Sequence, residues 1–472
     1  MELEVIIGLE IHAQLSTKTK LFCSCDNDAF GAKPNTRVCP VCMGFPGMLP
    51  VLNDVALRKG VKGAAALGCE IKPFSKFDRK NYFYPDLPTG YQISQFDQPI
   101  AEHGKVEIEM PEGNKIIGIT RVHLENDAGK LTHNVGGTLC DYNRAGTPLV
   151  EIVTEPDMRS PEEAQALAKE IQKIVRAVGA STADMEKGMM RFDASISMRP
   201  VGDEKLYPRT EIKNLNSFSA LFKALKHEVK KQKKAWAAGE PPTQETTVGW
   251  LDDKEETKLL RDKESAMDYR YFPEPDLPPV TFTEEEIADV MASIPELPMV
   301  KKHRYINDLK LTEAEALKIA ESPELYDFFE KAVELGGEPR KLGGLFLSVI
   351  LAVTDWQATG ITPQHLSDTL VLQTEGKISS TAAKEILQVL MEDADKTAEA
   401  VMEDKGLEQK SDTGEIDAWV EQVVNENPDV VAEIKAGKDK GVQFLMGQVM
   451  KMSRGSANPP LVMQSLQKKL NG

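Results

Sequence analysis

The chain has 472 residues, more than one hydrophobic core supports, which predicts two to four domains. Its content of 41% hydrophobic and 28% charged residues is ordinary for a soluble globular protein. The formal net charge of −17 excludes a surface that attracts nucleic acid everywhere, so any contact with RNA must come from basic residues that are gathered locally.

The sequence gives no sign of a targeting or membrane segment. It opens with the acidic residues M-E-L-E, which lack the basic start of a signal peptide. The longest nearly apolar run, residues 342–353, is about half of the ~20 residues needed to cross a bilayer and favours a buried helix. We therefore expect a cytoplasmic protein that does not enter a membrane.

Residues 5–15 read V-I-I-G-L-E-I-H-A-Q-L and predict a strand, because apolar and polar residues alternate strictly from Leu9 onward. Glu10, His12 and Gln14 then share one face. A carboxylate and an imidazole two residues apart can reach one metal ion or one reacting group. A solvated face of an edge strand is an equally good interpretation of this pattern alone.

Four cysteines form two close pairs, Cys23-Ser-Cys25 and Cys39-Pro-Val-Cys42, with 13 residues between the pairs. Two such pairs across a loop can place four thiolates tetrahedrally around zinc. Four thiolates leave no open position for a substrate, so the sequence predicts a structural zinc. Reduced free thiols and a redox pair are the competing interpretations.

Residues 78–88, D-R-K-N-Y-F-Y-P-D-L-P, are dense in aromatics, charges and prolines and are expected to form an irregular loop. Lys80 could neutralise a phosphate there, and Tyr82 could stack or donate a hydrogen bond. A surface loop held by its aromatic side chains explains the segment equally well. Residues 268–279 repeat the same composition.

Two further strands are expected over residues 116–125 and 149–153. His123 and Glu125 share a face of the first strand, and Glu151 stands among apolar neighbours in the second. A carboxylate in such a run needs a metal, a cation or a proton, because burying it unpaired is costly. One sheet could gather Glu10, His12, Glu125 and Glu151 into an oxygen-rich site that favours Mg²⁺.

Residues 160–178 predict a helix that begins with Ser160 as its N-cap. Beyond it, residues 190–199 and 209–214 predict strands with polar faces. Arg191 and Asp193 lie on one such face, and Glu211 and Lys213 on the other. These faces suit a nucleotide or a charged acyl substrate, and an exposed sheet with weak cross-strand ion pairs is the alternative.

After residue 279 the composition changes, and residues 283–405 are mostly helical in period. We expect domains over residues 1–290, 291–405 and 406–472, in an α+β protein. Residues 428–472 carry seven Lys and Arg against three Asp and Glu. Basic helix ends in this tail fit an RNA backbone, although compensation of helix dipoles explains them too.

Taken together, these motifs resemble the B subunit of the tRNA-dependent amidotransferase, over the whole length of the chain. The resemblance rests on eight segments: 8–15 (G-L-E-I-H-A-Q-L), 38–47 (V-C-P-V-C-M-G-F-P-G), 81–95 (N-Y-F-Y-P-D-L-P-T-G-Y-Q-I-S-Q), 123–130 (H-L-E-N-D-A-G-K), 149–157 (L-V-E-I-V-T-E-P-D), 211–218 (E-I-K-N-L-N-S-F), 268–279 (D-Y-R-Y-F-P-E-P-D-L-P-P) and 444–451 (F-L-M-G-Q-V-M-K).

The resemblance implies a sheet-based cradle, a helical domain and a small helical tail that engages tRNA. It implies that ATP and Mg²⁺ are used to phosphorylate the side-chain carboxylate of Glu-tRNA(Gln) or Asp-tRNA(Asn). Ammonia from a partner amidase subunit then attacks, and a small linker subunit completes a heterotrimer. The chain has no G-x-x-x-x-G-K-[ST] loop and no amidase signature, which agrees with a different nucleotide cradle and an external ammonia source.

By the resemblance, His12, Glu125 and Glu151 hold Mg²⁺, with Glu10 close by. The other implied site residues are the cradle residues Asp193, Glu211 and Lys213, the nucleotide contacts Lys80, Tyr82 and Arg191, and the zinc ligands Cys23, Cys25, Cys39 and Cys42. The chain departs from the family pattern at Thr89, Asn126 and Ser195, where lysine, glutamate and asparagine are expected, and at residues 345–346, which replace a tryptophan-containing segment.

Two other functions remain open at this point. A zinc-containing RNA-binding module would bind tRNA regardless of ATP. A stand-alone metallohydrolase would turn over without a partner chain. The sequence also leaves open whether Glu-tRNA(Gln), Asp-tRNA(Asn) or both are the substrates.

Overall fold

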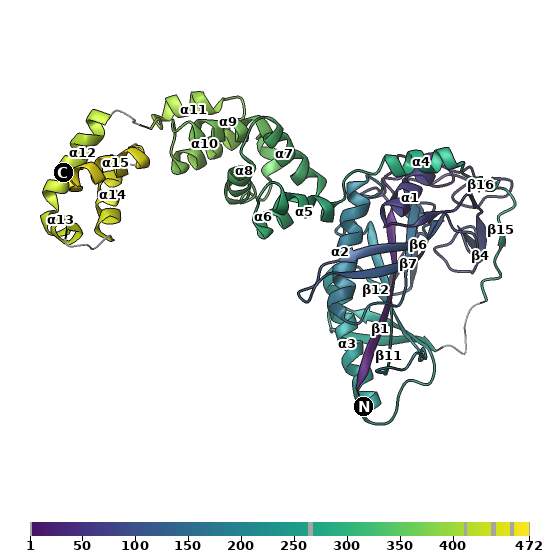
Figure 1. The fold of residues 1–472 in the computed structure, drawn as a ribbon. Helices are drawn as coiled ribbons and strands as arrows, with labels where there is room; N and C mark the ends of the chain where they lie inside the picture. The colour runs from purple at the N-terminus through teal and green to yellow at the C-terminus, as the bar shows by residue number, and fades with distance from the viewer. Residues whose placement is uncertain (1, 263–267, 410–412, 436–439, 454–456, 472) are drawn as a thin grey trace. The chain divides into compact units, whose positions relative to one another are not determined.

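The computed structural model describes residues 2–262, 268–409, 413–435, 440–453 and 457–471. The chain forms two compact units, Met1–Pro298 and Met299–Gly472 (Figure 1). The first unit is rich in strands and the second is helical, so the expected α+β class is confirmed. No helix of the described residues is both long and apolar enough to span a membrane.

A nine-stranded sheet organises the first unit, in the order β14-β13-β12-β11-β1-β10-β7-β6-β2. All neighbouring strands are antiparallel except β12 and β13. The strands are β1 (Leu3–Gln14), β2 (Glu70–Ile71), β6 (Ala101–Ile108), β7 (Lys115–Asn126), β10 (Pro148–Thr154), β11 (Met190–Pro200), β12 (Thr210–Leu215), β13 (Thr246–Leu251) and β14 (Glu256–Asp262). The five strands predicted from the sequence are confirmed as β1, β7, β10, β11 and β12.

Helices α1 (Asp54–Ala66), α2 (Pro161–Ala177) and α3 (Phe218–Ala237) pack against the sheet, and α4 (Glu284–Ala292) packs against α1. Figure 1 shows α2 and α3 running along one side of the strands. The side chains of Leu9, Ile11 and Ala13 are buried in the same apolar core as the inner faces of these helices. Ser160 caps α2 as expected, accepting a hydrogen bond from the Glu163 backbone N–H at 3.2 Å. The alternate side chains of β1 are left for the opposite, polar face.

The expectation of an irregular loop over residues 78–88 is wrong for its first four residues. These form β4 (Asp78–Asn81), which lies between β5 (Tyr91–Ser94) and β15 (Phe272–Pro273). Arg79 anchors the pairing through its Nε, which lies 2.6 Å from Glu274 Oε2. The two segments of similar composition are therefore partners in one small sheet, and the proline-rich remainder connects β4 to β5.

Among the described residues of this unit, two more pairs of short strands form. Strands β3 (Phe74–Ser75) and β16 (Val280–Thr281) pair with each other. Strands β8 (Lys130–Asn134) and β9 (Gly137–Asp141) form a hairpin, which leads into the 3₁₀ turn η1 (Tyr142–Arg144). The hairpin and its turn thus bring the Arg144 side chain back towards the sheet, where it binds Asp127 just beyond the end of β7.

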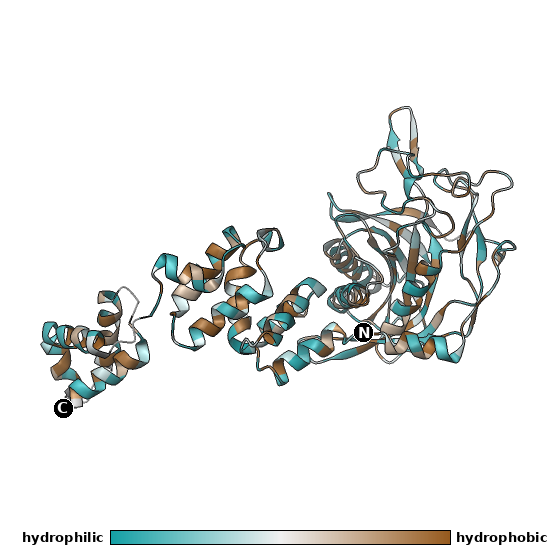
Figure 2. Ribbon diagram, turned by 90° about the horizontal axis from the view of Figure 1, so that it is seen from above, coloured by the Kyte–Doolittle hydropathy of each residue, from teal (hydrophilic) through white to brown (hydrophobic). Residues whose placement is uncertain are grey.

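The second unit contains two apolar clusters, one spanning residues 305–402 and one spanning residues 416–470. The helices of the first are α5 (Pro298–Asn307), α6 (Glu313–Ile319), α7 (Pro323–Glu334), α8 (Pro339–Leu345), α9 (Pro363–Thr374), α10 (Ser380–Glu392) and α11 (Ala398–Lys405), with a π-helical turn (Phe346–Ile350) after α8 and a 3₁₀ turn (Trp356–Thr359) before α9. Those of the second are α12 (Thr413–Glu426), α13 (Pro428–Lys435), α14 (Lys440–Met452) and α15 (Pro459–Asn471). Each helix mixes hydrophobic and hydrophilic residues, as Figure 2 shows, in keeping with one buried face.

The basic tail is only partly described. Lys451 stands in the last turn of α14, and Lys468 and Lys469 stand in the last turn of α15. Lys438 and Arg454 lie outside the described residues. The proposal that this tail contacts RNA therefore rests on sequence charge.

Candidate active site

A row of polar side chains crosses four strands on the face of the sheet opposite the helices. The antiparallel register places His12 of β1 beside Arg191 of β11 on one side and beside Glu151 of β10 on the other. Glu151 is in turn paired with His123 of β7. Residues far apart in the sequence therefore become neighbours, because their strands are adjacent in the sheet.

Two imidazoles and two carboxylates converge at the centre of this row. His12 Nε2 lies 3.2 Å from Glu151 Oε2 and 3.5 Å from Glu125 Oε1. His123 Nε2 lies 3.3 Å from the same Glu151 oxygen. The ligand atoms of His12, Glu125 and Glu151 all lie within 4.8 Å of one another, and all three side chains are buried. This arrangement can hold one cation.

The charges in the cluster depend on one another. Burial opposes ionisation of Glu151, but His123 and His12 hold the pKa of Glu151 well below its usual range. Burial also opposes a charged His12, but Glu151 and Glu125 raise the pKa of His12. Positive charge is thus favoured between the two carboxylates, and a divalent cation could supply it, because oxygen and imidazole ligands meet there.

A second group of acids lies next to the first. Glu10, Asp193 and Glu211 offer oxygens within 4.8 Å of one another. The Lys213 Nζ lies 3.1 Å from Asp193 Oδ2 and 2.8 Å from Glu211 Oε1. Burial opposes the ammonium, but these two carboxylates raise the pKa of Lys213. Burial, together with Glu151 and Asp193, raises the pKa of Glu10.

Arg191 was expected at the site, but its charged neighbours Asp127 and Arg144 were not. Its guanidinium donates to Asp127 Oδ1 at 3.1 Å, and Arg144 donates to Asp127 Oδ2 at 2.7 Å. Asp127 is 3% exposed. Burial opposes its charge, but Arg191 and Arg144 hold the pKa of Asp127 below its usual range.

Lys80 and Tyr82, two residues apart in the chain, both lie beside Tyr269. The Lys80 ammonium lies 5.0 Å from the centre of the Tyr269 ring, and the ring of Tyr82 lies 6.1 Å from it. Burial opposes the charge of Lys80, but Glu125 raises the pKa of Lys80. Burial raises the pKa of Tyr82 to about 12. Both side chains therefore keep their protons at neutral pH.

One cavity of about 430 Å³ is lined by seven of the ten residues expected around the cation and the nucleotide, whereas Glu10, Glu151 and Glu211 do not line it. Its lining includes His12, Lys80, Tyr82, Glu125, Asp127, Arg144, Arg191, Asp193 and Lys213. Glu10 instead lines a neighbouring cavity of about 680 Å³, together with Ser195 and Arg209. The polar face therefore offers two adjoining hollows, with the acids Glu10, Asp193 and Glu211 between them.

Of the four departures from the family pattern, two make local side-chain hydrogen bonds and a third lies within the β1–β11 ladder. Thr89 donates through its hydroxyl to the Tyr91 carbonyl. Asn126 accepts from the Ile93 backbone N–H at 2.7 Å, which fastens β7 to β5. Ser195 is half-buried beside Gly8 in the β1–β11 register.

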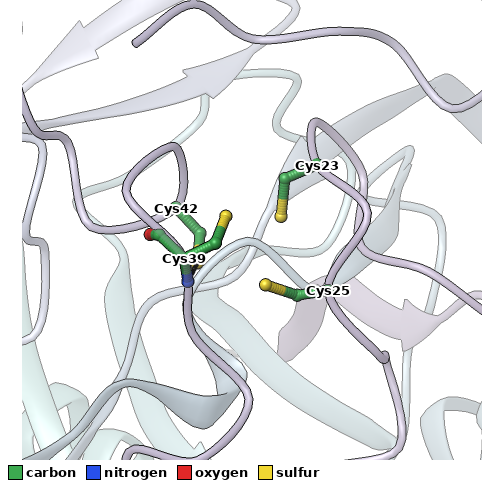
Figure 3. Close-up of side chains that lie close together, drawn as sticks. All are labelled: Cys23, Cys25, Cys39 and Cys42. Atoms are coloured by element: carbon green, nitrogen blue, oxygen red, sulfur yellow. Dashed lines mark hydrogen bonds between the residues drawn. The ribbon is translucent and has the colours of Figure 1, made fainter.

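The four cysteines form a separate cluster on two loops that precede α1. Their sulfur atoms lie within 4.8 Å of one another. Figure 3 shows Cys23 and Cys25 on one loop turned toward Cys39 and Cys42 on the other. The hydrogen bond from Cys23 lowers the pKa of Cys42 to about 5, and Lys20 contributes to this shift. Four converging thiols with one stabilised thiolate could hold a metal ion.

Comparison with known proteins decides the family. Residues 5–288 match the family model described as the GatB/GatE catalytic domain, and residues 327–470 match that of the GatB domain. The chain belongs to the GatB family.

Curated family members resemble the chain over its whole length. It is 46% identical to the B subunit of the aspartyl/glutamyl-tRNA(Asn/Gln) amidotransferase of Persephonella marina, over 100% of both chains. The proteins of the same name from Brevibacillus brevis and Oceanobacillus iheyensis are 45% and 46% identical, over 99% and 100% of each chain. The resemblance inferred from the eight motifs is confirmed.

Three residues of the site were not among those expected from the sequence of this GatB-family chain. His123 could have been found, because it shares a strand face with Glu125. Asp127 and Arg144 lie in turns, where side-chain direction has no period, so no alternation indicated them. The only signal for Asp127 is its place in the family motif H-L-E-N-D-A-G-K, residues 123–130.

Proposed function

We propose that the chain is the B subunit of a glutamine-dependent tRNA amidotransferase and phosphorylates the side-chain carboxylate of Glu-tRNA(Gln) or Asp-tRNA(Asn). Family membership supports the amidotransferase assignment and implies ATP use. The observation that supports the chemistry is the buried cluster of His12, Glu125 and Glu151, with Lys213, Arg191 and Lys80 around it.

The cluster fits phosphoryl transfer because this reaction needs charge neutralisation more than covalent help from the protein. Ammonia cannot readily displace an oxide from a carboxylate, but it can displace phosphate from an acyl phosphate. The carboxylate of the substrate is therefore phosphorylated first. A carboxylate oxygen of the substrate attacks the γ-phosphorus of ATP, and ADP leaves. Ammonia then attacks the carbonyl carbon of the acyl phosphate, phosphate leaves, and the amide is formed.

His12, Glu125 and Glu151 would hold Mg²⁺, with Glu10 close by. The ion would neutralise phosphate oxygens and stabilise the charge on the leaving group. Lys213 is held by Asp193 and Glu211 at the edge of the cavity, where its ammonium can bind an incoming carboxylate or phosphate. Arg191 and Lys80 would bind the phosphates of the nucleotide, and Tyr82 would stack or donate beside them.

The remaining parts of the proposal concern assembly. An amidase subunit would supply the ammonia and a small linker subunit would join the two chains in a heterotrimer. The tail, residues 406–472, would contact the tRNA, and a structural Zn²⁺ would be bound by Cys23, Cys25, Cys39 and Cys42. The complex would act in the cytoplasm.

Single-turnover phosphate release from ATP tests the proposal. The chain is co-purified with the amidase and linker subunits and mixed with Mg²⁺, ATP and either mischarged or correctly charged tRNA. We expect release only with mischarged tRNA, and its loss in Glu125→Gln. Release that is independent of the charging state of the tRNA, or that survives the substitution, would contradict the proposal and favour an RNA-binding module.

A further inference from the structure

The 3₁₀ turn η1 supplies Arg144 to the active site. Arg144 is bound to Asp127, which is bound to Arg191, which lies opposite His12 in the sheet register. The position of η1 therefore decides whether this chain of charges is complete. Backbone hydrogen bonds from Gly146 to Asp127 and from Thr147 to Arg144, both at 2.9 Å, close the turn against the site.

The other side of the same turn is fastened to the loop that carries Cys39 and Cys42. Asn143 is 1% exposed, donates to the Lys33 carbonyl at 2.7 Å and accepts from the Arg37 backbone N–H at 2.8 Å. Asn35 donates its backbone N–H to Asp141 Oδ1 at 3.0 Å and accepts from the Tyr142 backbone N–H at 2.8 Å. The cysteine loop and η1 thus share a reciprocal set of hydrogen bonds.

Lys20 joins the two parts from within. Its side chain is completely buried, and its Nζ donates to the Arg37 carbonyl and to the Ala145 carbonyl, both at 2.7 Å. The same Nζ lies 3.7 Å from Cys42 Sγ. No carboxylate among the described residues forms an ion pair with it. A buried ammonium without a carboxylate needs another negative charge nearby.

Four thiolates around a bound Zn²⁺ would supply that charge, since such a site would carry a net charge of about −2. Gly146 also approaches closely, because a Cβ at this position would lie 3.4 Å from both Cys42 Cβ and Lys20 Cδ. The cysteine cluster, Lys20 and the turn are thus in direct contact. An ordered cysteine loop fixes the Arg37 carbonyl and the Cys42 sulfur beside the Lys20 ammonium, while Ala145, directly after η1, supplies the second carbonyl.

We propose that Lys20 is a positioning residue that couples the cysteine-bound zinc to the active site: zinc orders residues 33–42, and Lys20 and Asn143 hold η1 on this loop so that Arg144 reaches Asp127. Zinc would then orient an arginine of the active site without touching the substrate. The coupling itself can be measured without reference to the proposed function, and only its kinetic consequence rests on that function.

Hydrogen–deuterium exchange of the full chain measures the coupling directly. Removing zinc with a chelator should speed exchange in peptides covering residues 127–147 by about tenfold or more, and Lys20→Met should do the same with zinc present. The exchange rate of peptides covering α2 should not change. Asn143→Ala, which removes two of the hydrogen bonds, gives the same readout should Lys20→Met fail to fold. Faster exchange confined to residues 20–45, or a chain that binds no zinc, would overturn the proposal.

A double-mutant comparison in the co-purified complex then tests the route through Arg144. We expect Lys20→Met to lower kcat for amidation about tenfold with little change in KM, and to add less than about twofold in an Arg144→Ala background. Lys59→Met is the control, since Lys59 donates from α1 to the Gly179 carbonyl and should leave kcat unchanged. Losses that multiply would show that Lys20 acts independently of Arg144. An inactive unsubstituted complex would instead refute the proposed function. The coupling would then be tested by the hydrogen–deuterium exchange experiment alone.

Discussion

Replacing Asp127 by asparagine should destabilise the first unit, because it weakens the pairing of Asp127 with Arg144 and Arg191. The carboxylate is buried and receives charge-assisted hydrogen bonds from Arg144 at 2.7 Å and from Arg191 at 3.1 Å. Each such bond contributes about 1.5–3 kcal/mol where it is fully buried. Both guanidiniums are partly exposed, at 34% and 39% of their side-chain surface, so solvent screening lowers the sum. We expect Asp127→Asn to cost about 2–4 kcal/mol at neutral pH.

The pH dependence of this loss tests the cause. The two arginines lower the pKa of Asp127 in the folded protein, so its stabilising contribution is present above the pKa of the unfolded chain. It is lost as pH falls through the folded pKa, and the two proteins should converge in acid. Calorimetry at several pH values measures this. The matched control is Asp54→Asn, which breaks an exposed pair with Arg58 on α1 and should change little. A loss below about 0.5 kcal/mol, or one that is the same at every pH, would refute the reasoning.

Three further substitutions probe other parts of the molecule. His12→Ala should abolish Mg²⁺-dependent phosphate release while tRNA binding, measured by filter retention, persists; release within about tenfold of the unsubstituted complex would place the cation elsewhere. Cys42→Ser should reduce bound zinc, measured by elemental analysis, from about one ion per chain to almost none and lower the melting temperature, whereas full zinc content would show that the thiols do not hold the ion. Ile11→Ala should cost about 2–5 kcal/mol in thermal unfolding because Ile11 is fully buried under the helices, and a smaller cost would mean that the core refills the space.

Much of the site could be predicted because alternation fixes which face of a strand a residue occupies. Glu10 and His12 were placed together on one face of β1, and the buried Glu151 was expected to need a positive neighbour. The alternation of residues does not indicate the order of the strands in the sheet. β11 lies beside β1 although it comes after β10 in the chain, and this places Arg191 opposite His12. Such a neighbour depends on long-range pairing.

The errors and omissions have the same origin. Residues 78–81 read as loop because prolines and aromatics follow them, but pairing with β5 and β15, anchored by Arg79 and Glu274, makes them a strand. His123 was placed on the correct face but not in the site, because the register that brings it to Glu151 was unknown. Lys20 carries no sequence signal, since its burial comes from the folding of two loops around it.

Transfer of oxygen from substrate to phosphate tests the central claim most directly. The mischarged tRNA is prepared with ¹⁸O at both oxygens of the side-chain carboxylate. The phosphate released by the full complex with ATP, Mg²⁺ and glutamine is examined by mass spectrometry. Attack of that carboxylate on ATP predicts one ¹⁸O atom in each phosphate and one in the amide product. Phosphate without ¹⁸O, whose fourth oxygen comes from water, formed while amidation proceeds, would contradict phosphorylation of the substrate.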